Sequence, residues 1–311
     1  FMERYAPSIK DLAPRDMVSR AIATEISAGN GAGPDSDYVY LDLTHLGAET
    51  IKKKLPDITD FVRTYVKIEP IEEPIPVQPT AHYAMGGIPT DVHSRVLSDE
   101  KGTVLPGVYA AGEAACVSVH GANRLGTNSL LDIVVFGKRA GQSMVDYVTQ
   151  TKPNTISDSA SDDLSKKIQN LIDKEHTDEF SVANIRKDLQ ESMEENAKIF
   201  RTKETLEKQT EILEELRERY ENVTIFDKSK VHNSELVEAI ELDYLLDMSE
   251  ATVASALARN ESRGAHSRQD FPDRDDTNFM KHSFAFKKDN SANLKYKDVE
   301  LGKYEPMERK Y

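Results

Sequence analysis

Apolar residues recur every three to four positions in several stretches of the chain, which is the spacing of one face of an α-helix. This pattern predicts helices over residues 15–28, 48–62 and 128–148. Short runs of β-branched and aromatic residues predict strands at 38–43 and 108–113. The first half of the chain is therefore predicted to mix helices with short strands.

The second half is patterned differently. Lys152-Pro153-Asn154 and the Ser/Asp-rich stretch after it predict a linker. Three amphipathic stripes follow, and they predict an antiparallel bundle of three helices. The stripes are Ile185, Leu189, Met193 and Phe200; Leu206, Thr210, Leu213, Leu216 and Tyr220; and Leu236, Ile240, Tyr244 and Met248. The last fifty or so residues lack periodicity and are predicted to lie extended over another surface.

The strand at 108–113 ends on Gly112 and Glu113, so it is predicted to be a buried strand that delivers a carboxylate to its C-terminal end. Ligands of open α/β sheets bind at that end, where a carboxylate can accept hydrogen bonds from sugar or ribityl hydroxyls. The next helix is predicted to begin with Asn128 or Ser129 as its N-cap. Its positive end would stabilise a phosphate or the edge of a reduced flavin.

A dinucleotide-binding fold also needs a glycine-rich turn between a strand and a helix. The only comparable run, Gly29-Asn30-Gly31-Ala32-Gly33-Pro34, follows a helical pattern and is typical of a helix C-terminus and loop. The phosphate-binding turn is therefore predicted to lie outside this chain. Because the chain also opens on Phe1, we expect it to be part of a longer polypeptide.

Composition narrows the classes of partner. The formal net charge of −14 argues against nucleic acid and against direct adhesion to anionic lipid. The single Cys116 excludes an internal disulfide framework, and no spacing of histidine, cysteine and carboxylate residues suggests a metal site. The apolar runs are far too short to span a membrane.

Four segments resemble the succinate dehydrogenase/fumarate reductase flavoprotein family. They are Pro14-Arg15-Asp16-Met17-Val18-Ser19-Arg20, residues 79–90 with His82-Tyr83-Ala84-Met85-Gly86-Gly87, residues 107–141 with His120-Gly121-Ala122-Asn123-Arg124, and residues 261–272 with Glu261-Ser262-Arg263-Gly264-Ala265-His266. Their order along the chain matches the family, and the resemblance covers nearly the whole sequence.

The resemblance implies an α+β or α/β fold in four parts. Residues 1–77 would be the end of a capping domain, and 78–152 the returning part of a Rossmann-like FAD-binding domain. Residues 153–260 would form the helical bundle, and 261–311 an extended C-terminal region.

The resemblance also implies the chemistry. The full subunit would oxidise succinate to fumarate, with hydride transfer to FAD and electron transfer to an iron-sulfur subunit and quinone. The histidine that attaches FAD covalently would lie in the absent N-terminal half, and this chain alone would be inactive. The location implied is the cytoplasmic face of a bacterial or archaeal inner membrane, or the matrix side of the mitochondrial one, with membrane anchor subunits contacted only indirectly.

Three residues are implied to handle the substrate. Arg124 and His82 would bind its two carboxylates, and Arg15 would be the proton shuttle. From residue type alone, Arg124 could instead form a structural salt bridge, and His82 could be a core histidine. Arg15 could be a helix residue paired with Asp16 or Glu25.

The FAD contacts implied for this part of the chain are Glu113, Asn128, Ser129 and Leu130, with Ser129 and Leu130 acting through backbone N–H groups. A second basic group is expected to be a solvated or interdomain salt-bridge network. It consists of Arg263, His266, Arg268 and Arg274.

Other functions stay open. Fumarate reductase shares the site residues, and L-aspartate oxidase shares the His-Tyr and His-Gly-Ala-Asn-Arg elements. Residues 128–132, Asn-Ser-Leu-Leu-Asp, favour the dehydrogenase branch, whereas the Arg-rich segment from 267 to 276 fits the oxidase less well. The non-enzyme alternative is an interaction module without flavin.

Overall fold

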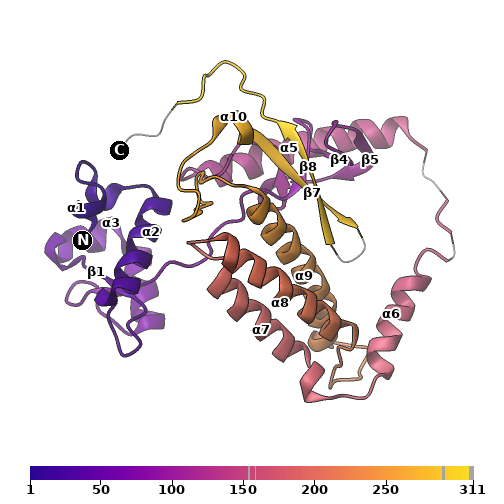
Figure 1. Ribbon diagram of the computed structural model, residues 1–311, viewed down its shortest axis with the longest axis horizontal. Helices are drawn as coiled ribbons and strands as arrows, with labels where there is room; N and C mark the ends of the chain where they lie inside the picture. Colours follow the sequence, from indigo (N-terminus) through magenta and orange to yellow (C-terminus); the bar gives the residue numbers. More distant parts are fainter. Residues whose placement is uncertain (153–154, 158, 289–290, 308–311) are drawn as a thin grey trace. The chain divides into compact units, whose positions relative to one another are not determined.

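The computed structural model describes residues 1–152, 155–157, 159–288 and 291–307, so Pro153 and Asn154 of the predicted linker lie outside it. The chain forms two compact units, one comprising residues 1–82 with Met307 and the other residues 83–306. Both mix helices with short sheets (Figure 1). Within the described residues, no helix combines the length and the apolar character that a membrane crossing requires.

The first unit contains short helices and one two-stranded antiparallel sheet, β1–β2. Its elements are α1 (Met2–Tyr5), η1 (Lys10–Leu12), α2 (Arg15–Glu25), η2 (Ile26–Asn30), β1 (Val39–Leu41), η3 (Thr44–Leu46), α3 (Ala48–Lys54), α4 (Pro56–Phe61), η4 (Val62–Val66) and β2 (Ile75–Val77). The predicted helix at 15–28 is confirmed as α2 and η2. It ends at Gly29, whose φ of 82° is the left-handed conformation typical of helix C-termini.

The prediction of one helix over 48–62 is wrong. The chain forms α3 and then α4, and Leu55 between them has φ −132° and ψ 43°. Pro56 explains the break, because a proline ring crowds the preceding residue and disfavours its helical conformation. Proline is nevertheless well tolerated as the first residue of α4, where no N–H donor is needed.

The second unit begins with two small strand pairings and a long helix. Its elements up to the linker are β3 (Ile88–Pro89), β4 (Arg95–Leu97), β5 (Val104–Tyr109), η5 (Gly112–Ala114), β6 (Ala115–Cys116) and α5 (Asn128–Gln150). β3 pairs in parallel with β6, and β4 pairs antiparallel with β5.

Two details of this region correct the sequence predictions. Strand β5 is largely exposed rather than buried, with Val108 44% exposed, because only β4 pairs with it among the described strands. The long helix is confirmed, but its N-cap is Thr127, which has a φ of 72° and no side-chain capping bond. Asn128 is already the first helical residue.

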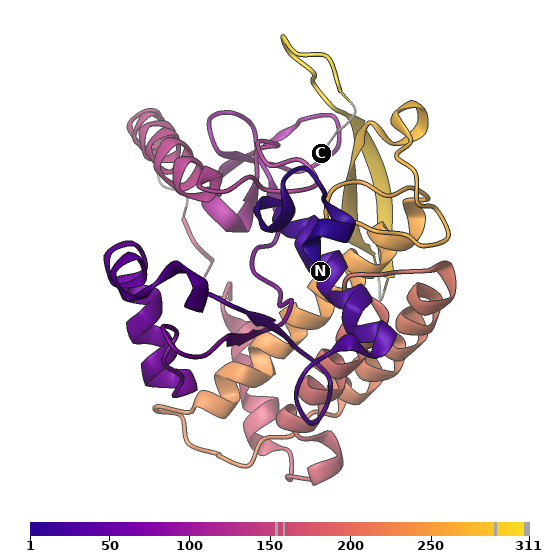
Figure 2. The ribbon, with the colours of Figure 1, turned by 90° about the vertical axis from the view of Figure 1, so that its left-hand side faces the viewer.

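A helical bundle follows, and it holds the largest core of the described chain. The elements from the linker onward are α6 (Asp162–Asp173), η6 (Asp178–Phe180), α7 (Val182–Asn196), α8 (Lys203–Glu221), α9 (Ser234–Ala258), α10 (Asp276–Phe279), β7 (Lys281–Lys288) and β8 (Ser291–Asp298). Helices α7, α8 and α9 lie side by side in Figures 1 and 2. Ser181, Thr202 and Asn233 provide side-chain N-caps for these helices.

The predicted stripes of the bundle are confirmed only in part. The buried Ile185 and Leu189 on α7, and Leu206 and Leu213 on α8, belong to their stripes, although Phe200 lies beyond the end of α7. On α9 the stripe is confirmed only at Leu236 and Ile240, which pack against the core. The helix buries Ala239, Leu242, Leu246, Val253 and Ala256, whereas Tyr244 and Met248 of the predicted stripe are more than half exposed. Because α9 is apolar on several sides, its sequence did not specify one buried face.

The C-terminal region is more regular than predicted. Strands β7 and β8 form an antiparallel hairpin with pairs from Lys281–Asp298 to Lys288–Ser291 (Figure 2). The phenyl rings of Phe284 and Phe286 stack with centroids 6.4 Å apart. The hairpin packs against α9, which supplies the apolar surface that the strands lack by themselves.

Arg268 joins the C-terminal region to the bundle. It is 1% exposed, and its Nη1 donates to the carbonyl oxygens of Ala256, Leu257 and Arg259 at 3.1, 3.2 and 3.4 Å. The same guanidinium binds both carboxylate oxygens of Asp270, at 2.8 and 2.7 Å. Arg268 therefore satisfies carbonyls at the C-terminal end of α9 that the helix itself leaves unpaired.

We expect Arg268→Ala to lower the free energy of unfolding by about 3–5 kcal/mol, the usual cost of removing one partner of a buried ion pair. Urea denaturation followed by circular dichroism measures this change. The matched control is Arg274→Ala, because Arg274 forms an exposed pair with Asp276, and it should cost at most about 1 kcal/mol. Equal losses in the two variants would contradict the expected role of Arg268.

Candidate functional site

The loop between β6 and α5 carries Arg124 and lies between the other candidate residues of the second unit, Glu113 in η5 and Asn128, Ser129 and Leu130 in α5. The N–H of Ala265 donates to the carbonyl oxygen of Ala122 at 3.0 Å, so the turn at 263–266 supports this loop. A Cβ at Gly264, whose φ is +60°, would lie 2.5 Å from the Ala122 oxygen. Glycine is therefore required for the two backbones to approach this closely.

Arg124 is half-buried in this loop. Its Nη1 donates to the carbonyl oxygen of Leu125 and to Oγ of Ser129, both at 3.3 Å. Its guanidinium carbon lies 4.6 Å from the centroid of the Tyr83 ring. Its Nε is buried and has no hydrogen-bond partner among the described residues. The absence of an acidic partner there argues against the structural salt bridge, and the unused donor suits an anionic ligand.

Tyr83, His120 and Asp132 form a polar chain beside Arg124 that sequence reasoning missed. Nε2 of His120 lies 3.0 Å from Oδ2 of Asp132 and 3.2 Å from the Tyr83 hydroxyl. Burial raises the pKa of Tyr83, as do the negative charges of Asp132 and Glu113. The sequence signal for this chain is weak, because Tyr83 and His120 are 37 positions apart.

The strand was predicted to end at Glu113, but β5 ends at Tyr109. Glu113 lies four residues further on, in the short helical turn η5. Its Oε1 accepts a hydrogen bond from the N–H of Ala84 at 2.9 Å. Its carboxylate thus fixes the segment that begins with Tyr83, while the residue itself is exposed. An exposed carboxylate can also accept hydrogen bonds from ligand hydroxyls.

Asn128, Ser129 and Leu130 form the first turn of α5. Oγ of Ser129 accepts the bond from Arg124, and the N–H of Leu130 donates to the carbonyl oxygen of Thr127 at 3.0 Å. A Cβ at the preceding Gly126 would meet no described atom within 4 Å. There is therefore open space at Gly126, close to the positive end of this 23-residue helix and to Arg124.

Arg15 and His82 belong to the first unit. Arg15 is the exposed first residue of α2. It is a residue at the start of a helix, as the structural alternative holds, but the pairing of that alternative is absent from the described residues: Asp16 pairs with Arg20 at 2.8 Å, and Glu25 pairs with Arg4 at 2.6 Å.

His82 is exposed, which excludes the core histidine considered above. It lies at the boundary of the two units, and it is followed directly by Tyr83 of the second unit.

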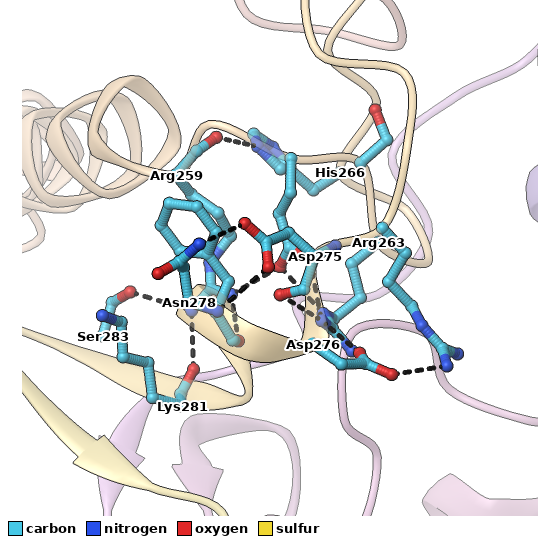
Figure 3. Close-up of polar contacts among 12 residues, drawn as sticks. Arg259, Arg263, His266, Asp275, Asp276, Asn278, Lys281 and Ser283 are labelled. Atoms are coloured by element: carbon cyan, nitrogen blue, oxygen red, sulfur yellow. Dashed lines mark hydrogen bonds and ion pairs between the residues drawn. The ribbon is translucent and has the colours of Figure 1, made fainter. Parts of the chain in front are cut away.

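The second basic group is a structural network, as expected, but much of it is buried rather than solvated (Figure 3). Glu261 is 0% exposed and accepts hydrogen bonds from Arg259 at 2.7 Å and from Arg263 at 2.8 and 2.9 Å. Burial acts to raise the pKa of Glu261, but the bonds from Arg263, the Asp275 N–H and Arg259 outweigh it and lower that pKa. Arg263 also binds Asp276 at 2.8 Å.

His266 is held as a neutral ring within this network. Its Nδ1 lies 3.1 Å from Nη1 of Arg201, and its Nε2 lies 3.2 Å from the carbonyl oxygen of Arg259. A guanidinium can only donate, so Nδ1 accepts and Nε2 carries the hydrogen. Burial lowers the pKa of His266 to about 4, and the charges of Arg201, Arg268 and Arg259 act in the same direction.

The pKa of His266 predicts a pH-dependent stability. The unfolded chain binds a proton on this histidine below pH 6.5, whereas the folded chain does so only near pH 4. The contribution to stability is therefore complete above pH 6.5 and is lost as the pH falls to 4. In the wild type the denaturant midpoint should be lower at pH 5 than at pH 7. In His266→Gln the difference between the two midpoints should be smaller. The exposed His93→Gln is the control, and an unchanged pH dependence in His266→Gln would contradict the assignment.

The chain is similar to known flavoproteins over most of its length. Residues 1–130 match the model of the FAD binding domain, and residues 186–311 match the model called Fumarate reductase flavoprotein C-term. The chain is 47% identical to the succinate dehydrogenase flavoprotein subunit of Rickettsia bellii over 92% of its length, and 40% identical to the fumarate reductase flavoprotein subunit of Escherichia coli over 97%. It spans about half the length of these relatives, 48% and 50% respectively.

Solved structures of the same kind of flavoprotein also match this chain. A quinol fumarate reductase of Escherichia coli matches with a TM-score of 0.87 and 38% identity, covering 96% of this chain and 51% of that one. The Sdh1 complex of Mycobacterium smegmatis with UQ1 matches with a TM-score of 0.76 and 33% identity, covering 96% and 49%. These matches confirm the predicted α+β fold.

The residues present fit a flavin. An exposed carboxylate on Glu113 offers an acceptor for hydroxyls, and the N-terminus of α5 offers a positive end for an electron-rich ring. The FAD binding domain match and the flavoprotein relatives confirm FAD as the cofactor. The chain is a flavoprotein that belongs to the succinate dehydrogenase/fumarate reductase flavoprotein family.

Proposed function

We propose that this chain is part of the flavoprotein subunit of a succinate dehydrogenase, and that the whole subunit oxidises succinate to fumarate. The observation that carries the proposal is the half-buried Arg124, whose Nε has no partner among the described residues. A planar guanidinium with a desolvated donor is well suited to a carboxylate.

The chain's own residues would act on a dicarboxylate as follows. Arg124 binds one carboxylate and His82 donates to the other, which orients the two central carbons. Arg15 accepts the proton that leaves one of these carbons, or returns it in the reverse reaction. FAD, when bound, supplies the acceptor of the hydride from the other carbon.

Four residues would hold the flavin: Glu113 through its carboxylate, and Asn128, Ser129 and Leu130 at the positive end of α5. The electrons would leave one at a time to an iron-sulfur subunit and then reach quinone through a complex with membrane anchor subunits. The Mycobacterium smegmatis structure with UQ1 and the quinol fumarate reductases support such an assembly. The subunit itself would be peripheral to the membrane.

Fumarate reduction is the second candidate, because relatives at 40–43% identity are named fumarate reductase flavoprotein subunits. The same three residues would serve both directions. Redox partners outside this chain would set the direction of flux.

The test begins with the protein purified from its native source. We expect an intact mass well above the 34.9 kDa of this chain and flavin that survives denaturation. Succinate should reduce an artificial electron acceptor, and malonate, a dicarboxylate that cannot be dehydrogenated, should inhibit this reaction. A flavin-free polypeptide of 34.9 kDa that does not turn over succinate would support the interaction module instead.

A further inference from the structure

We propose that His120 is a positioning residue for Arg124. Held by Asp132, it fixes the ring of Tyr83 on which the Arg124 guanidinium lies. The inference rests on the proposed function, in which Arg124 binds a carboxylate of the substrate. It concerns how the Arg124 guanidinium is kept in one place before the substrate binds. None of the substrate-contacting residues has this role.

The first step is the orientation of His120. A buried carboxylate accepts hydrogen bonds, so the His120 Nε2–H donates to Oδ2 of Asp132, 3.0 Å away. The side chains of His120 and Asp132 are 9% and 2% exposed. Asp132 lies in the second turn of α5, which makes it a rigid anchor for the imidazole.

The second step is the contact between His120 and Tyr83. The Tyr83 hydroxyl lies 3.2 Å from Nε2, and the two rings meet edge to face, with centroids 5.4 Å apart and an interplanar angle of 84°. Tyr83 itself comes from a segment without regular secondary structure. The imidazole, through its ring face and the shared Nε2–H, and the bond from the Ala84 N–H to Glu113 are thus contacts that hold this segment in place.

The third step is the dependence of Arg124 on that ring. The two hydrogen bonds of its Nη1 are long, at 3.3 Å each, and both come from the same nitrogen. The Tyr83 ring at 4.6 Å is the broad surface that defines the plane of the guanidinium. A long side chain with weak anchors loses rotamer freedom on binding, so an ordered ring beneath it favours binding by pre-organisation.

Unsatisfied atoms in the same group support a functional role. Nδ1 of His120 and Oδ1 of Asp132 are buried without a partner among the described residues. Unpaired buried polar atoms are costly, so a group selected for stability alone would favour apolar residues here. The polar chain instead places a negative charge and a hydrogen-bond donor behind the ring that carries Arg124.

The test uses the full-length, FAD-containing enzyme and malonate as the probe. His120→Phe keeps an aromatic ring but removes the donor, and we expect the dissociation constant for malonate to rise about ten-fold, near the lower end of the effect of one lost hydrogen bond to a charged group. The KM for succinate should rise similarly, with a smaller change in kcat. Flavin content and the melting temperature report on folding.

Two further variants separate positioning from a general structural defect. His120→Gln can place an amide N–H near the position of Nε2, so it should recover most of the affinity. Tyr83→Leu removes the ring and should match His120→Phe. The exposed His93→Phe is the matched control and should leave the dissociation constant unchanged.

The outcomes are distinct. An unchanged dissociation constant in a folded His120→Phe enzyme overturns the proposal, and so does an equal loss in His120→Phe and His120→Gln. If His120→Phe does not fold, normal malonate binding by Tyr83→Leu overturns it. Failure of the wild-type enzyme to bind malonate would refute the proposed function itself, rather than the role of His120.

Discussion

Arg124→Ala in the full-length enzyme should lower kcat/KM for succinate by about 1000-fold or more, while FAD stays bound. Truncating one partner of a buried, hydrogen-bonded charge pair costs about 2–5 kcal/mol, and about 4 kcal/mol corresponds to a 1000-fold change. The loss should be this large because the substrate carboxylate would lose its cation in a site where Arg124 is half-buried and has no acidic partner among the described residues.

Steady-state kinetics with an artificial acceptor measure this effect, and the flavin absorbance of the purified variant checks that the cofactor is retained. The matched control is Arg139→Ala, because Arg139 is exposed on α5 and donates only to the carbonyl oxygen of Val92 among the described residues. Retained succinate turnover in Arg124→Ala would remove Arg124 from the substrate site.

Arg15→Lys is the second variant with a large expected effect. It keeps the positive charge, so malonate binding should stay within about two-fold of the wild type. Turnover should fall by about 100-fold or more, the usual contribution of a positioned proton-transfer group, because the shorter ammonium group does not reach the position of the guanidinium.

The two readouts for Arg15→Lys are kcat with succinate and the dissociation constant for malonate. Arg63→Lys is the control, since Arg63 is an exposed residue of the same unit and pairs with Glu69 at 2.7 Å. A normal kcat in Arg15→Lys would assign the proton shuttle to another residue. A loss of malonate binding would place Arg15 among the residues that hold the substrate.

Local patterns predicted the long helices well, because periodicity and terminal residues act within a few positions. The helix at 128–148 and the C-terminus at Gly29 are examples. Predictions failed where the burial of a residue depends on elements that are distant in sequence but packed against it. The buried face of α9 depends on which helices and strands cover it, and the exposure of β5 depends on which strands pair with it.

The break before Pro56 differs from these failures. Its signal is local, and the helical periodicity across residues 48–62 obscured it.

In the candidate site, too, residues with a local sequence signal could be predicted, and residues brought together only by folding could not. Glu113 and Arg124 stand in motifs that the sequence displays in one run, so they could be named in advance. Tyr83, His120 and Asp132 could not be grouped, because only the folded chain brings them together. In the sequence, Tyr83 is noticeable only because it follows His82, and His120 only because it begins the motif that contains Arg124.

The bond from Ala265 to Ala122 has a consequence for premature termination of translation. A stop codon placed shortly after α9 would leave the codons for Arg15, His82 and Arg124 intact, and the product would still contain every residue assigned to substrate. It would lack the turn at 263–266, which supports the backbone two residues before Arg124. Such a messenger would therefore encode all three substrate residues, but with Arg124 on an unsupported loop.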